Sequence, residues 1–252
     1  MSGKVYLVGA GPGAPDLLTL RAARLLGEAD VVLHDALVHP ETLALASRAE
    51  RIAVGKRCGR QSSAQRFINK RLVDAARRHR VVVRLKGGDP MLFGRAQEEI
   101  CALEQAGIEY EVVPGVTAAL AAAADLGVSL TQRGAARSVA FVTPRVGAGE
   151  APSQWARTGA AADTAVIYMG AGDAAHVRLA LLDAGVADGT PVALVESASL
   201  EGSRSVRGTL AQLEALAATR GDGPVVIVLG RVVAAATESR LPAEAIASAI
   251  AA

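Results

Sequence analysis

The segment with the clearest chemical content is a glycine turn that carries one carboxylate and joins an apolar run to a helix pattern. It reads Arg84-Leu-Lys-Gly-Gly-Asp-Pro-Met-Leu-Phe-Gly-Arg95 and follows the valines 81–83. Gly87 and Gly88 lack a Cβ, so the backbone here can approach a ligand closely. Asp89 then places a carboxylate at the carboxyl edge of a sheet, where open α/β proteins bind small molecules. The alternative is a strand-to-helix connection that merely needs turn residues.

Two other strand ends each carry an ionisable side chain. Asp35 follows the apolar run 31–33, and Lys56 follows the run 51–54 within Gly55-Lys-Arg57. An acid and a base raised from neighbouring strand ends can act as proton acceptor and donor, provided that burial and neighbours adjust their pKa values. A salt bridge between the two loops is the alternative. The pattern predicts that these loops and the glycine turn converge on one crevice.

The first glycine-rich turn, Gly9-Ala-Gly-Pro-Gly13, superficially resembles a dinucleotide-binding loop, with Asp30 or Asp35 near the position of a ribose carboxylate. Pro12 removes an amide donor where a pyrophosphate would need free N–H groups, and Ala14-Pro15 replaces the expected helix start. The loop therefore argues against a nicotinamide enzyme. It fits recognition of a ligand that carries no phosphate.

The net charge of +2 conceals an uneven distribution. Residues 51–86 contain twelve Lys and Arg residues and one acid, Asp74, which gives +11, and the remaining fifteen bases and twenty-four acids give −9. A concentrated cationic surface suits a polyanion, either nucleic acid or a small molecule with many carboxylates or phosphates. A solvated helix face over residues 63–79 is the alternative, and it explains Lys56, Arg57, Arg84 and Lys86 less well.

The bulk composition limits the class of protein. The 252 residues can bury a sizeable aliphatic core, since half of them are hydrophobic and few are aromatic. No run approaches a membrane span and the N-terminus lacks signal-peptide features, so we expect a cytoplasmic protein without a membrane partner. Cys58, Cys101 and four histidines show no metal-ligand spacing, and we predict no metal site.

The first half alternates strand and helix patterns and predicts a mostly parallel, doubly wound sheet. Strands are expected at 5–8, 31–33, 51–54, 81–85 and 109–113, with helices at about 17–27, from 40, 62–79, 95–106 and before 126. The second half predicts a mixed sheet with strands at 138–142, 164–168, 191–195, 225–229 and a short one at 204–207, and helices at about 172–184 and 209–218. Residues 128–134 have the mixed composition of a linker. We therefore expect two α/β domains, 1–127 and 134–240, and a tail at 241–252.

Several motifs occur together in an order that is typical of one protein family. They are Val8-Gly-Ala-Gly-Pro-Gly-Ala-Pro-Asp-Leu-Leu-Thr-Leu20, His34-Asp-Ala-Leu-Val38, Val54-Gly-Lys-Arg57, Arg84-Leu-Lys-Gly-Gly-Asp-Pro90, Phe93-Gly-Arg95, Val113-Pro-Gly-Val-Thr-Ala118, Tyr168-Met-Gly170 and Val192-Ala-Leu-Val-Glu196. Over about residues 4–235 the chain resembles the uroporphyrinogen-III C-methyltransferases of the tetrapyrrole methylase superfamily. The Gly-Lys-Arg and Arg-Leu-Lys-Gly-Gly-Asp-Pro motifs are the more specific to this member.

The resemblance implies two α/β domains with S-adenosylmethionine in the active cleft between them, in a homodimer. Carried over by position, the cofactor-binding residues are Pro12, Gly87, Gly88, Asp89, Leu92, Thr117, Ala118, Met169, Ala198, Pro224, Val225 and Ile227. The resemblance also makes Asp35 the proton acceptor and Lys56 the proton donor. Both roles agree with the placement argued from strand ends.

The implied reaction transfers two methyl groups to carbons 2 and 7 of uroporphyrinogen III and gives precorrin-2 by way of precorrin-1, in sirohaem and cobalamin biosynthesis. The enzyme must align donor and acceptor and then remove a proton from the macrocycle. The substrate bears eight carboxylates, so Arg57, Arg84 and Arg95 are the expected carboxylate contacts.

Two loops depart from the family pattern, at Thr143-Pro-Arg145 and at Arg60-Gln61. Three other functions remain as alternatives. Another precorrin methyltransferase would share the cofactor pocket, but Lys86-Gly-Gly-Asp89 argues against it. An RNA methylase of the same superfamily would use the cationic segment, although few aromatic residues are interleaved to stack bases. A regulatory protein that only binds the cofactor would leave Asp35 and Lys56 without a role.

Overall fold

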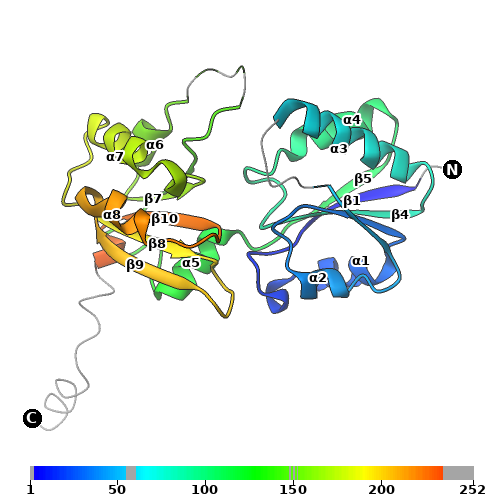
Figure 1. The fold of residues 1–252 in the computed structure, drawn as a ribbon, viewed down its shortest axis with the longest axis horizontal. Coiled ribbons are helices and arrows are strands. Elements are labelled where there is room, and N and C mark those ends of the chain that lie inside the picture. The colour runs from blue at the N-terminus through cyan, green and yellow to red at the C-terminus, as the bar shows by residue number, and fades with distance from the viewer. Residues whose placement is uncertain (1–2, 55–60, 148, 150, 152, 235–252) are drawn as a thin grey trace, which may run out of the picture. The chain divides into compact units, whose positions relative to one another are not determined.

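The structure, a computed structural model, describes residues 3–54, 61–147, 149, 151 and 153–234, with backbone alone at 61–64. The chain divides into two compact units, residues 1–121 and 122–252, and each contains one five-stranded sheet (Figure 1). The two units, each with one sheet and its helices, confirm the predicted α/β fold class. The helix α5 (Ala118–Leu126) crosses the division between the units.

The sheet of the first unit is parallel throughout, with the strand order β3-β2-β4-β1-β5. Its strands are β1 (Lys4–Gly9), β2 (Val31–His34), β3 (Glu50–Ala53), β4 (Val81–Lys86) and β5 (Tyr110–Val113). Parallel strands are covered on both faces, which explains why they appear in the sequence as continuous valine and leucine runs. The order makes β2, β4 and β1 neighbours, so their carboxyl ends meet at one edge of the sheet.

Helices cover both faces of this sheet: α3 (Gln61–Ala76) and α4 (Ala96–Gln105) lie on one side, and α1 (Leu20–Glu28) and α2 (Pro40–Ala44) on the other (Figure 1). Alternate residues of β1 serve the two cores. Leu7 packs with Leu72 of α3 and Leu103 of α4, and Val8 packs with Leu26 of α1. Alternate side chains of each strand thus pack into the two aliphatic cores on opposite faces of the sheet.

The first helix begins later than expected. Pro15–Leu17 forms a 3-10 turn, Leu18 and Thr19 are extended, and α1 starts at Leu20. Thr19 is the N-cap, because its Oγ1 accepts a hydrogen bond from Ala22 N at 3.2 Å. The apolar pattern of Leu17 and Leu18 extended the predicted helix across this cap.

The sheet of the second unit is mixed, with the order β6-β7-β10-β8-β9. Its strands are β6 (Val139–Val142), β7 (Thr164–Tyr168), β8 (Pro191–Glu196), β9 (Arg204–Thr209) and β10 (Val225–Gly230). β6 and β7 are parallel, whereas β10 runs antiparallel to both β7 and β8. The carboxyl ends of β7 and β8 therefore meet at the same edge as the start of β10.

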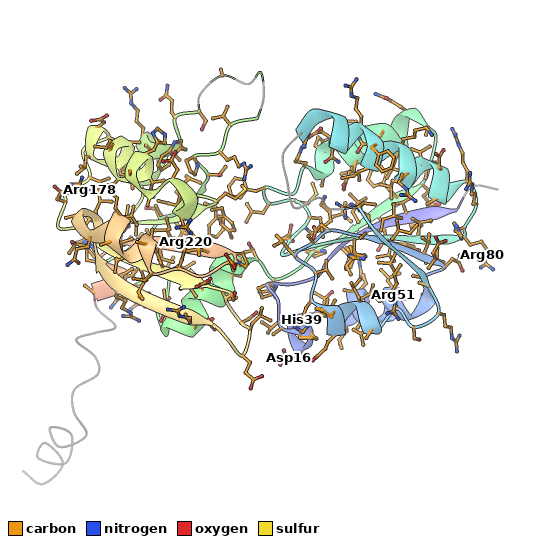
Figure 2. All side chains as sticks on the ribbon, in the orientation of Figure 1. Asp16, His39, Arg51, Arg80, Arg178 and Arg220 are labelled. Carbon is orange, nitrogen blue, oxygen red and sulfur yellow. The ribbon has the colours of Figure 1, made fainter. Side chains whose placement is uncertain are left out.

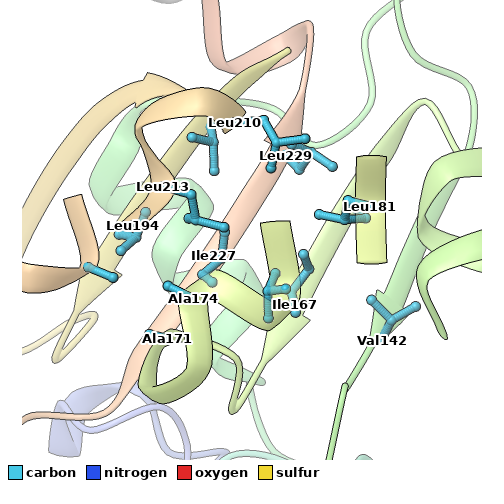
Figure 3. Packing of buried hydrophobic residues seen from close by; sticks show 14 of the residues in the cluster. Val142, Ile167, Ala171, Ala174, Leu181, Leu194, Leu210, Leu213, Ile227 and Leu229 are labelled. Carbon is cyan, nitrogen blue, oxygen red and sulfur yellow. The ribbon is translucent and has the colours of Figure 1, made fainter. Parts of the chain in front are cut away.

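An aliphatic core fills one face of this sheet, and Figure 3 shows Ile167, Leu194 and Ile227 packed in it. The helices α6 (Trp155–Ala161), α7 (Ala174–Asp183) and α8 (Leu213–Ala218) cover this face, and α5 lies on the other side (Figure 1). The sequence pattern did not predict α6. Its seven residues include Thr158 and Gly159, which are poor helix formers.

Residues 128–134, predicted to be a linker, lie in the second unit. Leu130 is buried, and its carbonyl accepts a hydrogen bond from Thr164 Oγ1 at 2.9 Å. The limits 1–127 and 134–240 stay predictions, and the expected tail at 241–252 is outside the described residues. Among the described helices, none is both long and apolar enough to span a bilayer.

Candidate functional site

Three glycines make the closest backbone contacts at the carboxyl edge of the first sheet. A Cβ on Gly9 would lie 2.6 Å from Gly115 Cα and 2.7 Å from the Gly88 carbonyl oxygen. Gly88 N donates to Gly11 O at 2.7 Å, and Gly11 N donates back to Gly88 O at 3.2 Å. These backbone contacts hold the loop that carries Pro12 against the turn at residues 87–89.

Asp89 fastens a third loop to the same place. Its Oδ2 accepts from Gly115 N at 3.0 Å, and its Oδ1 accepts from Met91 N at 2.8 Å. Thr117 then lies next to Gly88: its Cα is the nearest heavy atom to a Cβ built there, at 3.9 Å. The expected cofactor residues of the first unit thus share one edge of the sheet: Pro12, Gly87, Gly88, Asp89, Leu92, Thr117 and Ala118. Their contact with a cofactor stays a prediction.

Asp35 lies at this edge too, directly after β2. It is half-buried, and its two carboxylate oxygens have different partners. Oδ1 accepts from Leu37 N at 3.1 Å, and Oδ2 accepts from Gly87 N at 3.1 Å. The carboxylate is therefore held against the glycine turn with lone pairs left over. Lys56 and Arg57 are outside the described residues, so their predicted roles as proton donor and substrate contact stay predictions.

A buried ionic cluster lies beneath the edge. Glu99 of α4 is fully buried, and its carboxylate accepts from Arg84 Nε and Lys86 Nζ at 2.9 Å each. Arg84 also donates to the carbonyls of Leu33 and Leu85, at 3.4 and 3.1 Å. Burial, followed by the nearby Arg84 cation, lowers the pKa of Lys86, although Glu99 opposes the shift.

The side chain of Arg84 is 4% exposed, and its hydrogen bonds go to Glu99 and the backbone. These contacts favour a structural role for Arg84 in the first unit. Its predicted contact with a substrate carboxylate stays a prediction. Sequence reasoning missed Glu99, although its place on the apolar stripe of α4 with Ile100 and Leu103 was a visible signal for a buried, paired acid.

Arg95 behaves differently from Arg84. Its side chain is 44% exposed, and the guanidinium holds Glu98 through Nε–Oε1 at 2.6 Å and Nη2–Oε2 at 2.8 Å. The contact of Arg95 with a substrate carboxylate stays a prediction.

The cationic segment is not a single surface. Arg77, Arg78 and Arg80 lie before β4 at its amino end, and Figure 2 shows Arg80 there. Gly87 follows the other end, roughly 20 Å away for a strand of this length at about 3.3 Å per residue. These three arginines lie at the opposite edge of the sheet from Asp35. They therefore fit the alternative interpretation, in which these charges form a solvated surface and do not bind a ligand.

The second unit has an edge that carries the other expected cofactor residues. Met169 follows β7, Ala198 follows β8, and Pro224 precedes β10. The strand register pairs Val226 with Tyr168 and Val225 with Glu196, which aligns these ends. Ile227 does not share the edge. It is 1% exposed within the aliphatic core and its strand is paired on both sides. Its predicted contact with the cofactor stays a prediction.

Glu196 binds the loop that precedes β10 at this second edge. Its carboxylate accepts from Gly221 N and Gly223 N, at 2.9 Å each. These hydrogen bonds, the one from Gly221 first, lower the pKa of Glu196. Ser197 N also donates to Pro224 O at 2.9 Å. The loop before β10 is therefore attached to the end of β8.

Left-handed backbone conformations gather at the same two edges. Within the described residues, five non-glycine residues have positive φ, from 53° to 71°: Phe93, Arg95, Met169, Ser197 and Ser199. All of them follow the carboxyl ends of β4, β7 or β8. Such conformations cost free energy and concentrate where a site must be held in one geometry. This observation supports both edges as functional.

Comparison with known proteins agrees with this geometry. The family model "Tetrapyrrole (Corrin/Porphyrin) Methylases" matches residues 4–214. A siroheme synthase of Chromobacterium violaceum is 50% identical over 234 residues, which is 92% of this chain and 50% of that protein. The chain spans about half the length of the curated relatives that it matches.

Solved structures give the same result. The uroporphyrin-III C-methyl transferase of Thermus thermophilus, complexed with S-adenyl homocysteine, has a TM-score of 0.79 and 43% identity, covering 92% of this chain and 100% of that one. A cobalt precorrin-4 methyltransferase has a TM-score of 0.80 but 29% identity, covering 91% and 95%. Diphthine synthase, at 16% identity and a TM-score of 0.62, shares the fold alone. With its parallel and mixed sheets and its matching motifs, the chain belongs to the tetrapyrrole methylases.

Proposed function

We propose that this protein is an S-adenosylmethionine-dependent C-methyltransferase that converts uroporphyrinogen III to precorrin-2 by way of precorrin-1. The observation that carries the proposal is the 43% identity to the Thermus uroporphyrin-III C-methyl transferase over the whole of that chain. The specific motif Arg84-Leu-Lys-Gly-Gly-Asp-Pro90 supports the same substrate. The product would serve sirohaem or cobalamin biosynthesis.

Sequence identity, more than shape, separates this function from its nearest alternative. The fold similarity to the precorrin-4 enzyme and to the Thermus enzyme is equal, with TM-scores of 0.80 and 0.79. The identities differ, at 29% and 43%. A common fold supports many substrates, so the residues at the site must carry the distinction. The motif Lys86-Gly-Gly-Asp89 favours uroporphyrinogen III as the substrate.

The residues at the first edge fit the proposed cofactor. Gly88 has a positive φ of 68°, and among the described residues only Thr117 Cα lies within 4 Å of the position of its absent Cβ. This leaves a strip of exposed backbone for an adenosyl or amino acid group to contact. Half-buried Leu92 and Pro12 supply apolar surface beside it. The sequence resemblance adds Met169, Ala198, Pro224 and Val225 of the second unit.

When bound, S-adenosylmethionine supplies a methyl group whose bond to sulfur breaks as the bond to the pyrrole carbon forms, which leaves S-adenosylhomocysteine. The macrocycle must then lose one proton for each methyl group gained. Asp35 takes this proton in our proposal, because its carboxylate is held at the sheet edge by two backbone N–H groups. Lys56 is the proposed proton donor.

The substrate contacts in this proposal are Arg57 and Arg95, because the burial of Arg84 favours a structural role for that residue. Each would bind a substrate carboxylate through its planar fork of N–H donors. A homodimer, a cytoplasmic location and the absence of nucleic-acid and membrane partners complete the proposal. These parts rest on the sequence alone.

The test is anaerobic incubation of the protein with uroporphyrinogen III and methyl-labelled S-adenosylmethionine, followed by mass analysis of the tetrapyrrole. We expect a product with two added methyl groups and two equivalents of S-adenosylhomocysteine. Binding of S-adenosylhomocysteine without methylation of this substrate would overturn the substrate assignment. A parallel incubation with a precorrin-4-type substrate tests the alternative.

A further inference from the structure

The turn after β8 places Ala198 between two strained residues. Ser197 has a φ of 53° and Ser199 a φ of 71°. Neither residue is a glycine, so each side chain makes the left-handed conformation unfavourable. Ala198 itself is 5% exposed. Something must offset the cost of this turn.

A carboxylate on α5 provides that compensation. Asp125 Oδ2 accepts from Ser199 N at 2.9 Å and from Ser203 Oγ at 2.5 Å. These two donors lie on either side of the stretch 200–202, so one oxygen holds Ser199, at the end of the turn, and Ser203, beyond it. Both hydrogen bonds are charge-assisted, which makes them stronger than neutral ones.

The helix that carries Asp125 is itself fixed in place. Arg207 of β9 donates to Leu126 O at 2.6 Å and to Val233 O at 3.1 Å. On the other side of the turn, Ser197 N donates to Pro224 O at 2.9 Å. The turn thus lies between a fixed helix end and the start of β10. Asp125 is the acid in an otherwise alanine-rich and leucine-rich helix, and its role is visible only in the folded chain.

We propose that Asp125 is a positioning residue for cofactor binding. It acts without touching the cofactor: it holds Ser199 in its left-handed conformation, and this fixes the neighbouring Ala198. The inference rests on the proposed function, in which Ala198 lines the S-adenosylmethionine pocket. Without Asp125 the turn relaxes toward ordinary φ values, and binding must supply the free energy that restores it.

The test measures S-adenosylhomocysteine affinity by titration calorimetry for the wild-type protein and for Asp125→Ala. We expect the Kd to rise about tenfold in the variant, as the loss of a hydrogen bond to a charged group implies. Asp125→Asn, whose amide oxygen can accept the same two hydrogen bonds, should retain most of the affinity. An unchanged Kd in Asp125→Ala would overturn the inference.

The matched control is Asp163→Ala. Asp163 Oδ2 also accepts from backbone and serine donors: Arg137 N at 2.8 Å, Ser138 N at 3.0 Å and Ser138 Oγ at 2.8 Å. It lies at the amino ends of β6 and β7, which is the opposite edge of the same sheet. We expect this variant to lower the melting temperature but to leave the Kd within twofold. Equal losses of affinity in both variants would show a general stability effect and would refute a positioning role.

A rescue experiment addresses the strain directly. Glycine adopts a φ of 71° without a Cβ penalty. Adding Ser199→Gly to Asp125→Ala should therefore lower the Kd for S-adenosylhomocysteine severalfold relative to Asp125→Ala alone. The same change added to Asp163→Ala should bring no gain. Failure of the rescue would refute the conformational explanation. If the wild-type protein does not bind S-adenosylhomocysteine at all, the proposed function fails and the inference fails with it.

Discussion

The carboxylate of Asp35, after β2, accepts a hydrogen bond from the backbone N–H of Gly87, after β4, at 3.1 Å. This contact joins the proposed base to the first residue of the glycine turn. The two strands are parallel neighbours, which places both ends at one edge. The proposed base and one wall of the proposed cofactor pocket therefore keep a fixed separation.

The first prediction concerns Asp35→Asn. The amide cannot take up the proton from the macrocycle, so we expect methyl transfer to fall by about 10²- to 10⁴-fold with little change in S-adenosylhomocysteine affinity. The measurement is a single-turnover assay with uroporphyrinogen III. Asp30→Asn is the control, because Asp30 accepts from Arg80 N and Val81 N at the amino end of the same sheet. Wild-type turnover in Asp35→Asn would remove the proposed role.

The second prediction separates two arginines of one motif. Arg95→Ala should raise the KM for uroporphyrinogen III about tenfold, because an exposed guanidinium contact to a carboxylate is lost. Arg84→Ala should instead lower the free energy of unfolding by about 3–5 kcal/mol, because the fully buried Glu99 then loses one of its two cationic partners and keeps Lys86 alone. Steady-state kinetics and urea unfolding of both variants distinguish the two. A raised KM in folded Arg84→Ala would reverse the assignment.

A third prediction tests the close approach of the glycine loops. Gly9→Ala places a Cβ 2.6 Å from the Gly115 backbone and 2.7 Å from Gly88 O. The loops must move apart, and we expect a loss of about 2–4 kcal/mol in unfolding free energy together with weaker cofactor binding. Gly27→Ala is the control. No atom of the described residues outside the helix's own backbone lies within 4 Å of its Cβ position, and the change should stabilise α1 by about 0.5–1 kcal/mol.

The fourth prediction is a pH dependence at Glu196. Its pKa is lowered in the folded protein, so its contribution to stability is fully present above the usual pKa of glutamate. That contribution is lost as the pH falls through the lowered value, because the folded state must then take up a proton. Glu196→Gln should be less stable than the wild type at neutral pH, by about 1–2 kcal/mol.

Urea unfolding of both proteins over a pH series measures this effect. The difference in unfolding free energy between wild type and Glu196→Gln should shrink as the pH falls through the acidic range. A difference that stays constant with pH would show that the charge of Glu196 contributes nothing.

Much of the fold follows from local pattern. The apolar runs at 31–33 and 81–83 predicted parallel strands because both faces of such strands are buried. The 3-10 turn at Pro15–Leu17 and the helix α6 were missed, because a cap and a short helix depend on a few contacts that composition does not reveal. The strand ends at Asp35 and Gly87 were placed correctly at one edge.

The sequence by itself determined the family, the alternation of strands and helices, and the residue types at the strand ends, because these depend on order along the chain. Only the tertiary structure decided which charged groups are committed to one another. Arg84 and Arg95 belong to one motif, yet one is buried against Glu99 and the other is exposed. Asp125 and Ser199 are far apart in sequence and are hydrogen-bonded in space. Burial and pairing depend on which elements pack together, and local sequence does not contain that information.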